Sequence, residues 1–121
     1  MSHKLSEHFT EDEFACKCGC GFCDVDPRLI AALEHLRKII NAPIHVNSGC
    51  RCEKHNASLK GSSPNSQHKL GKAADIVVKG LSPSVVAGIA EAVPEFDSGG
   101  IGIYGTFTHV DVRNGRARWL I

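Results

Sequence analysis

Two histidines and one aspartate have the residue types of a metal site. His68 and Asp75 lie seven positions apart, and His109 follows further along the chain. Two imidazoles and one carboxylate suit a catalytic Zn²⁺ ion, which keeps its fourth position for water. Asp75 also stands inside an apolar segment, where a buried carboxylate needs a compensating partner such as a metal ion. These three residues are therefore candidate ligands of a zinc ion.

The same three residues also have an interpretation without a metal. A single histidine at either position is commonly an ordinary polar residue. Asp75 could pair with Lys72 or Arg51 instead of a metal ion. Residue type and spacing leave both interpretations open.

The helices that must support this site are predicted from capping signals and apolar spacing. They are a short turn over 11–14 that begins with the capping box Thr10–Glu13, a helix that begins at Asp26 and Pro27 and ends before Asn41, and a helix from Ser82 that ends at Pro94. In the second of these, the apolar residues recur on one face at helical spacing. We expect that face to pack on a sheet.

The strands are predicted over 44–47, 73–78, 100–104, 107–112 and 116–121. Asn114 and Gly115 separate the last two, and this dipeptide is a strong signal for a tight hairpin. Consecutive late strands without a helix between them favour antiparallel pairing. The predicted class is therefore α+β.

Length and composition exclude several kinds of protein. The 121 residues suit one domain. A formal net charge of +1 argues against an electrostatically driven nucleic-acid or membrane-surface partner. No apolar run approaches the ~20 residues that span a bilayer, and the first residues lack a basic segment followed by an apolar one, so we expect no secretory signal.

Three segments resemble the D-alanyl-D-alanine peptidases of the M15 family. The pattern Ser-x-His-x-x-Gly-x-Ala-x-Asp, over residues 66–75, resembles the first zinc motif of that family. Residues 108–111 are similar to its last zinc-ligand strand, and residues 48–51 are similar to its Ser-Gly-Tyr-Arg segment, with Cys50 in place of tyrosine. Residues 65–68 and 100–104 are similar to the small, M15A-like branch. The resemblance covers nearly the whole chain from Phe9 onwards.

The resemblance implies a fold shared with the hedgehog signalling domain and the lysin metallopeptidases. We expect one domain over residues 1–121, with a small antiparallel sheet that carries the zinc site and helices packed on it. The Cys-rich segment 1–25 is expected to pack against this domain.

The resemblance also assigns roles around the three zinc ligands. Arg51 is expected to hold the carboxylate end or the carbonyl groups of a peptide, because its planar fork donates two parallel hydrogen bonds. Its alternatives are a solvated surface charge and a partner for Asp75. Ser66 and Gln67 are expected to contact the peptide or to shape the zinc loop, and loop geometry alone would also explain them.

The general base is less clearly marked. Many relatives carry an acid three residues before the last zinc histidine or a histidine two before it, whereas this chain has Thr106 and Phe107 there. Asp111 lies two residues after His109, and strand alternation places it on the same face. It is predicted either to act as the base or to orient a ligand histidine. Further candidates near Arg51 are His45, Glu53 and His55.

The six cysteines form two groups. These are Cys16, Cys18, Cys20 and Cys23, which fall within eight residues, and the pair Cys50 and Cys52. In a reduced compartment such a cluster more often binds metal, and in an oxidising cell wall it could form disulfides. We expect a structural staple of one kind or the other. No Cys-His pairing indicates a catalytic cysteine.

The resemblance implies a zinc peptidase that cuts D-Ala-containing amide bonds of peptidoglycan stem peptides, as carboxypeptidase or endopeptidase. Small size and the missing signal resemble a phage-encoded lysin, made in the cytoplasm and acting on the cell wall after release or as part of a virion. A monomer is expected. The alternatives are an inactive zinc-bound module that binds wall peptides or has a structural role, and a Cys-rich zinc protein that acts only in protein interactions.

Overall fold

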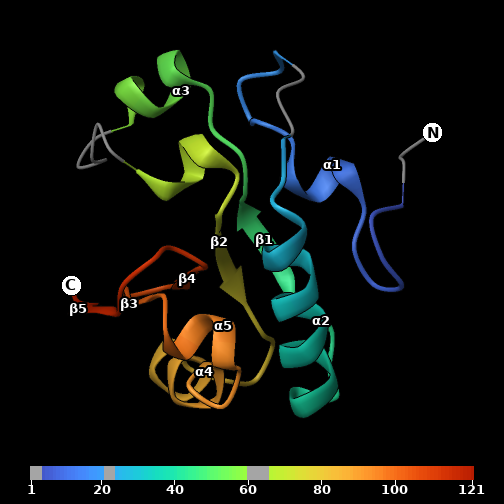
Figure 1. Ribbon diagram of the computed structural model, residues 1–121, viewed down its shortest axis with the longest axis vertical. Helices are drawn as coiled ribbons and strands as arrows, with labels where there is room; N and C mark the ends of the chain where they lie inside the picture. Colours follow the sequence, from blue (N-terminus) through green and yellow to red (C-terminus); the bar gives the residue numbers. More distant parts are fainter. Residues whose placement is uncertain (1–3, 21–23, 60–65) are drawn as a thin grey trace.

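One five-stranded sheet with short helices around it forms the structure (Figure 1). The computed structural model describes residues 4–20, 24–59 and 66–121. The helices are α1 (Glu11–Phe14), α2 (Pro27–Ile40), α3 (Glu53–Ser58), the 3₁₀ helix η1 (Gln67–Leu70), α4 (Pro83–Ala90) and α5 (Pro94–Asp97). The strands are β1 (His45–Ser48), β2 (Ala73–Val77), β3 (Gly100–Ile103), β4 (Thr108–Asp111) and β5 (Ala117–Leu120). The α+β class is confirmed.

The sheet is mixed, which corrects the expectation of an antiparallel sheet. Its order is β1-β2-β4-β3-β5, and β5 pairs with β3 in parallel. The predicted hairpin between β4 and β5 is wrong, because β2 and β3 occupy both edges of β4. The chain after Asp111 therefore turns back at Gly115, where φ is 95°, and reaches the free edge of β3.

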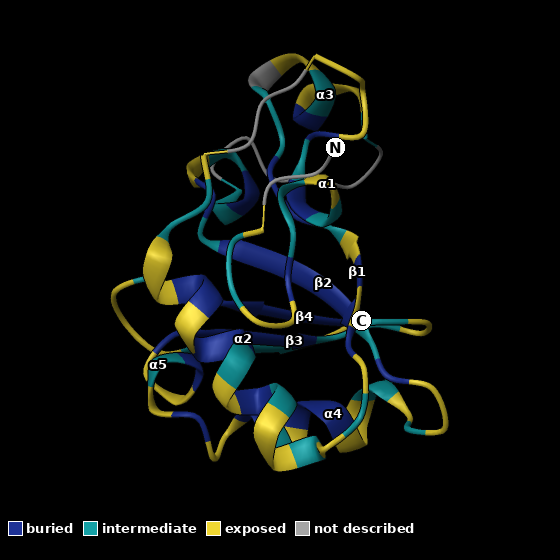
Figure 2. Cartoon of the chain, turned by 90° about the vertical axis from the view of Figure 1, so that its right-hand side faces the viewer, coloured by how far each residue is buried: buried dark blue, intermediate teal, exposed yellow. Residues whose placement is uncertain are grey.

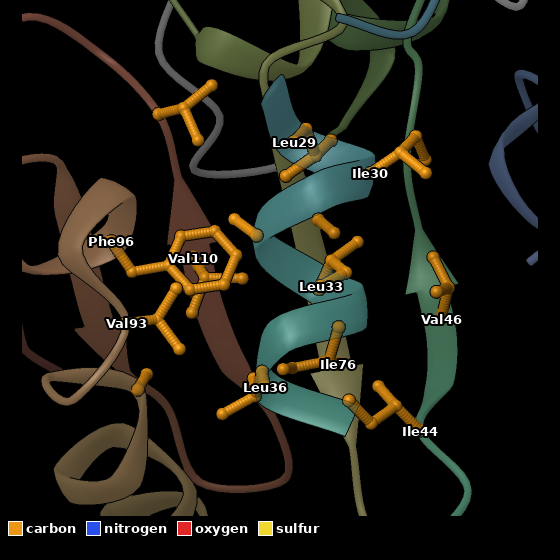
Figure 3. Close-up of a cluster of buried hydrophobic side chains, with 14 of the residues drawn as sticks. Leu29, Ile30, Leu33, Leu36, Ile44, Val46, Ile76, Val93, Phe96 and Val110 are labelled. Atoms are coloured by element: carbon orange, nitrogen blue, oxygen red, sulfur yellow. The ribbon is translucent and has the colours of Figure 1, made fainter. Parts of the chain in front are cut away.

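Helix α2 forms where its capping signals predicted it. Asp26 Oδ1 accepts the backbone N–H of Arg28 at 2.8 Å, Pro27 takes the first turn, and Asn41 ends the helix in the left-handed region. The apolar face buries Leu33 and Leu36, both fully inaccessible. Figure 3 shows these side chains between β1, β2 and the α5 region.

The hydrophobic core lies on one face of the sheet. Ile76 of β2 and Val110 of β4 point into it, together with Phe96 of α5 (Figure 3). Side chains alternate along a strand, so the residues next to Ile76 and Val110 point to the opposite face. Asp75 and His109 are those neighbours. The core thereby fixes which face of the sheet carries the predicted ligands.

Three short helices were not predicted. The polar segment after Cys52 forms α3, the loop before β2 forms η1, and Pro94 begins α5 rather than only ending α4. Side chains cap the first two: Cys52 Sγ accepts the N–H of His55, and Ser66 Oγ accepts the N–H of His68.

Across the described ranges, no helix has both the length and the apolar character that crossing a membrane requires.

The segment before α2 packs against two loops next to the predicted site, one at Cys50 and one at Gly71. Phe14 is fully buried in the core, and its carbonyl accepts the N–H of Cys50 at 2.7 Å. Asp26 N–H donates to the Gly71 carbonyl at 2.9 Å. Gly71 has φ 68°, and a Cβ there would overlap the carbonyl oxygen of Asp24. Figure 2 shows the buried strands β2 and β4 beneath this region.

Candidate metal centre

The sheet register brings two of the predicted ligands together. Asp75 of β2 lies directly opposite His109 of β4. His68 comes from η1, and the left-handed Gly71 turns the chain from η1 into β2. All three side chains are buried, with at most 6% of each residue exposed. The structure therefore brings the three candidate ligands together.

The donor atoms converge on one carboxylate oxygen. Asp75 Oδ1 lies 3.2 Å from His68 Nε2 and 3.0 Å from His109 Nδ1. The three ligand atoms lie within 4.8 Å of one another, and in the part of the chain that the structure describes this group has no fourth Cys, His, Asp or Glu member. A metal ion held here would keep a coordination position for water or substrate.

Hydrogen bonds decide which nitrogen of each histidine faces the site. His68 Nδ1 donates to the carbonyl of Gly49 at 2.7 Å, and His109 Nε2 donates to Asp111 Oδ2 at 2.7 Å. Neither acceptor has a proton to give, so in the neutral imidazoles the opposite nitrogens carry lone pairs. Both inward nitrogens point at Asp75: without a cation, a proton on each donates to the carboxylate, and a bound cation would replace these protons and take the lone pairs. This arrangement of electron-rich atoms fits a cation.

The charge state of the carboxylate fits a cation as well. Burial alone would raise the pKa of Asp75, but hydrogen bonds from His109 and His68 lower it well below its usual range. Burial alone would lower the pKa of His109, but its contacts with Asp111 and Asp75 outweigh burial and raise the pKa overall. Asp75 is thus ionised, in a group that could hold a positive ion.

Asp111 holds His109 from behind. It is fully buried, and Oδ1 accepts the Gly100 N–H at 2.9 Å, while Oδ2 accepts Arg113 Nη2 at 2.7 Å. Burial raises the pKa of Asp111, and His109 and Arg113 outweigh it, so the pKa lies well below its usual range. Both oxygens are engaged, and the contact with His109 is on the nitrogen that faces away from Asp75. Of its two predicted roles, this geometry favours the orientation of a ligand histidine.

Arg51 lies beside the metal ligands rather than in solvent. Its Nη2 donates to Asp75 Oδ2 at 3.2 Å, Nη1 to Asn56 at 3.3 Å and Nε to Ser48 at 3.3 Å. Its side chain is 13% exposed, and this burial lowers the pKa of the guanidinium. Arg51 is therefore a partner of Asp75, which was one of the alternatives for this residue. The same contact keeps Arg51 at the site.

The remaining candidates lie outside the ligand group. Ser66 Oγ caps η1, which is the loop-shaping alternative, and the Gln67 carbonyl accepts the Lys72 N–H at 3.1 Å. His45 is exposed on β1, and His55 lies on α3. Glu53 begins α3, and its side chain lies outside the described part.

The cysteines divide differently from the expectation. Cys16, Cys18, Cys20 and Cys52 form a second group whose sulfur atoms lie within 4.8 Å of one another. Cys50 is instead buried in the hydrophobic core. Cys23 lies outside the described residues.

Trp119 of β5 is a wall of the site that was not predicted. Its ring lies 5.0 Å from the ring of His109, and its Nε1 donates to the Tyr104 hydroxyl at 3.0 Å. Arg113 stacks over it at 5.2 Å. Gly102 makes room for it, because a Cβ at this position would overlap the indole ring. Sequence reasoning missed Trp119 because it paired β5 with β4. The observed pairing of β5 with β3 is what places Trp119 beside His109.

The fold, the His-Asp-His group and the sequence all indicate the same class of protein. The α+β domain carries a buried His-Asp-His group on one face of its sheet, and this group could hold a metal ion. The family model described as Peptidase M15 matches residues 7–111, and the chain belongs to this family. M15 peptidases are metal-dependent, which makes the protein a metallopeptidase by family. A search of curated proteins found no match.

Proposed function

We propose that the protein is a zinc peptidase that hydrolyses D-Ala-containing amide bonds in peptidoglycan stem peptides. The observation that carries this proposal is the convergence of one nitrogen of His68, one nitrogen of His109 and the carboxylate of Asp75 at a single point. Three protein ligands of this kind, with an open fourth position, are typical of catalytic zinc. The resemblance of residues 66–75 to the first zinc motif of D-alanyl-D-alanine peptidases supports the substrate class.

The chain's own groups prepare the site for this chemistry. When bound, zinc supplies a Lewis acid that polarises the scissile carbonyl and makes water a stronger nucleophile. The Gly49 carbonyl and Asp111 fix the two imidazoles in the tautomers that leave the inward nitrogens free. The three side chains are themselves shielded from solvent, which strengthens the electrostatic interactions between them.

Arg51 is the group that we propose for substrate binding. Its contacts with described residues use three of its five N–H donors. The others can donate to a peptide carbonyl or to a terminal carboxylate, where a guanidinium binds with fork geometry. Asp75 holds the guanidinium beside the ligand group, so a peptide bound by Arg51 lies next to the metal position.

A second candidate function is a zinc-bound module that binds wall peptides without cleaving them. One observation favours it: Asp111, the acid beside the last ligand, is fully enclosed and engaged at both oxygens. Action at the cell wall, as a free lysin or in a virion, stays a prediction, as do a monomeric state and the absence of a nucleic-acid partner.

Digestion of purified peptidoglycan and of synthetic D-Ala-terminated stem peptides, followed by mass spectrometry, separates the two functions. The zinc-loaded protein should release D-Ala or cross-linked fragments, and His68→Ala should not. His35→Ala removes an exposed histidine of α2 and serves as the matched control. Binding of the peptides without any cleavage would contradict the peptidase proposal and support the binding module.

A further inference from the structure

We propose that Cys16, Cys18, Cys20 and Cys52 hold a second zinc ion, with a structural role, at a site separate from the His-Asp-His centre. The two candidate groups share no residue. Three of the four thiols come from the loop after α1, and the fourth comes from the residue that caps α3. The inference does not depend on peptidase activity.

The distances between the sulfur atoms are those of a shared ligand. Cys16 Sγ lies 3.4 Å from Cys18 Sγ and 3.8 Å from Cys52 Sγ, and Cys18 and Cys52 are 3.6 Å apart. Four thiolates bound tetrahedrally to zinc at ~2.3 Å have their sulfur atoms ~3.8 Å from one another. A disulfide would bring one pair to ~2.0 Å and leave the other sulfurs outside it. Three nearly equal separations instead indicate one central ion.

The backbone around the thiols is arranged as in a metal-binding loop. Gly19 takes φ 86°, and its N–H donates to the Cys16 carbonyl at 3.2 Å, which folds the Cys16–Cys20 loop on itself. Cys52 N–H donates to Cys16 Sγ, and His55 N–H donates to Cys52 Sγ, both at 3.4 Å. Such N–H donors stabilise negative charge on sulfur and fix the direction of each ligand.

Cys50 is close in sequence to the cysteine group but is not a member of it. It lies two residues before Cys52 but is only 2% exposed and belongs to the hydrophobic core. Cys18 and Cys20, in contrast, are exposed. Exposed thiols that gather around the buried Cys16 and the half-buried Cys52 have no packing role to explain their position, and a closed tetrathiolate zinc site explains it.

A metal ion here would tie the N-terminal loop to the peptidase site. Cys52 follows Arg51, whose guanidinium contacts Asp75 and whose N–H donates to the His68 carbonyl at 3.0 Å. Structural zinc sites contribute directly to folding free energy. Loss of this ion should therefore loosen Arg51 and the loop that carries His68.

Metal analysis and cobalt absorption test the proposal. Protein purified under reducing conditions without chelator should contain two zinc ions per chain, one for each group. After replacement by Co²⁺, the wild type and His68→Ala should both show the near-ultraviolet charge-transfer absorption of cobalt thiolate. Cys18→Ser/Cys20→Ser should lose it, and the matched control Cys50→Ala should keep it. Absence of the absorption from wild type, or its loss in Cys50→Ala alone, would overturn the assignment.

Two further measurements keep the test decisive if the double variant does not fold. X-ray absorption of the zinc in His68→Ala should give a shell of sulfur neighbours at about 2.3 Å, and a shell of nitrogen and oxygen would overturn the proposal. Thiol titration of the unfolded wild type in chelator should find all six cysteines reduced. Fewer thiols would mean disulfides in place of zinc. None of these readouts requires peptide cleavage, so failure here is distinct from failure of the peptidase proposal.

Discussion

The two candidate ligand histidines present different nitrogens to the site, and one hydrogen bond behind each ring sets the choice. His68 offers Nε2 because Gly49 binds its Nδ1, and His109 offers Nδ1 because Asp111 binds its Nε2. Residue type and spacing marked His68, Asp75 and His109 as candidates, and the resemblance to the M15 zinc motifs favoured a metal. They could not predict the tautomers, because Gly49 and Asp111 reach the rings only through tertiary structure.

Asp111→Asn should weaken zinc binding, since an amide that donates to His109 Nε2 favours the tautomer with a proton on Nδ1. We expect a loss of roughly 10–100-fold in zinc affinity, with activity restored by added zinc. Zinc titration of the variant by calorimetry measures the first, and turnover at rising zinc measures the second. Asp97→Asn, at an exposed carboxylate, is the control. A loss of turnover of about 10²–10⁴-fold that zinc does not restore would identify Asp111 as the base instead.

Arg51→Lys tests substrate binding against structural support. Lysine keeps the charge near Asp75 but loses the planar fork. We expect kcat/KM on a stem peptide to fall at least tenfold, while zinc content is unchanged and stability falls by about 1 kcal/mol, the size of one hydrogen bond. Peptide kinetics and thermal unfolding give both values. Normal kinetics with a large drop in melting temperature would make Arg51 a structural residue.

Among the elements, those with strong local signals were predictable and those that depend on tertiary contacts were not. The caps and apolar face of α2 are contained in its own sequence. Helix η1 has four residues and needs Ser66 as a cap and β2 beside it. The partner of β5 depends on which strand edges are already occupied, and a local turn signal such as Asn114-Gly115 carries no information about that.

The packing of the N-terminal segment on η1 makes Gly71 a sensitive position. Gly71→Ala places a Cβ against the Asp24 carbonyl in a left-handed conformation, whereas Gly80→Ala has the same kind of φ with open space around it. Gly80→Ala should cost about 1–2 kcal/mol. Gly71→Ala should cost more and should also lower zinc affinity, because the loop that carries His68 must shift. Equal costs in chemical denaturation, with unchanged zinc binding, would contradict this packing.

At the scale of the whole molecule, Glu34 holds the residues around Ser6 and His8 against helix α2. It accepts hydrogen bonds from the Ser6 hydroxyl and from the His8 N–H at 2.7 Å. Burial raises the pKa of Glu34, but the contacts with Ser6 and His8 lower it overall.

Because the folded-state pKa of Glu34 lies below its unfolded value of about 4.3, ionised Glu34 contributes stability above that pH. This contribution is lost as the pH falls through the folded-state pKa. Glu34→Gln should therefore be less stable than wild type at pH 7, and the difference in free energy of unfolding should shrink as the pH falls below about 4.3. Urea denaturation of both proteins across this range measures it. A difference that is constant with pH would contradict the assignment.

The central claim is that His68, Asp75 and His109 hold the catalytic metal. Anomalous diffraction at the zinc edge, from crystals of the zinc-loaded protein, tests it most directly. We expect a peak about 2.0–2.2 Å from His68 Nε2, Asp75 Oδ1 and His109 Nδ1. A peak at the cysteine group alone, or a metal bound through His109 Nε2, would contradict the account.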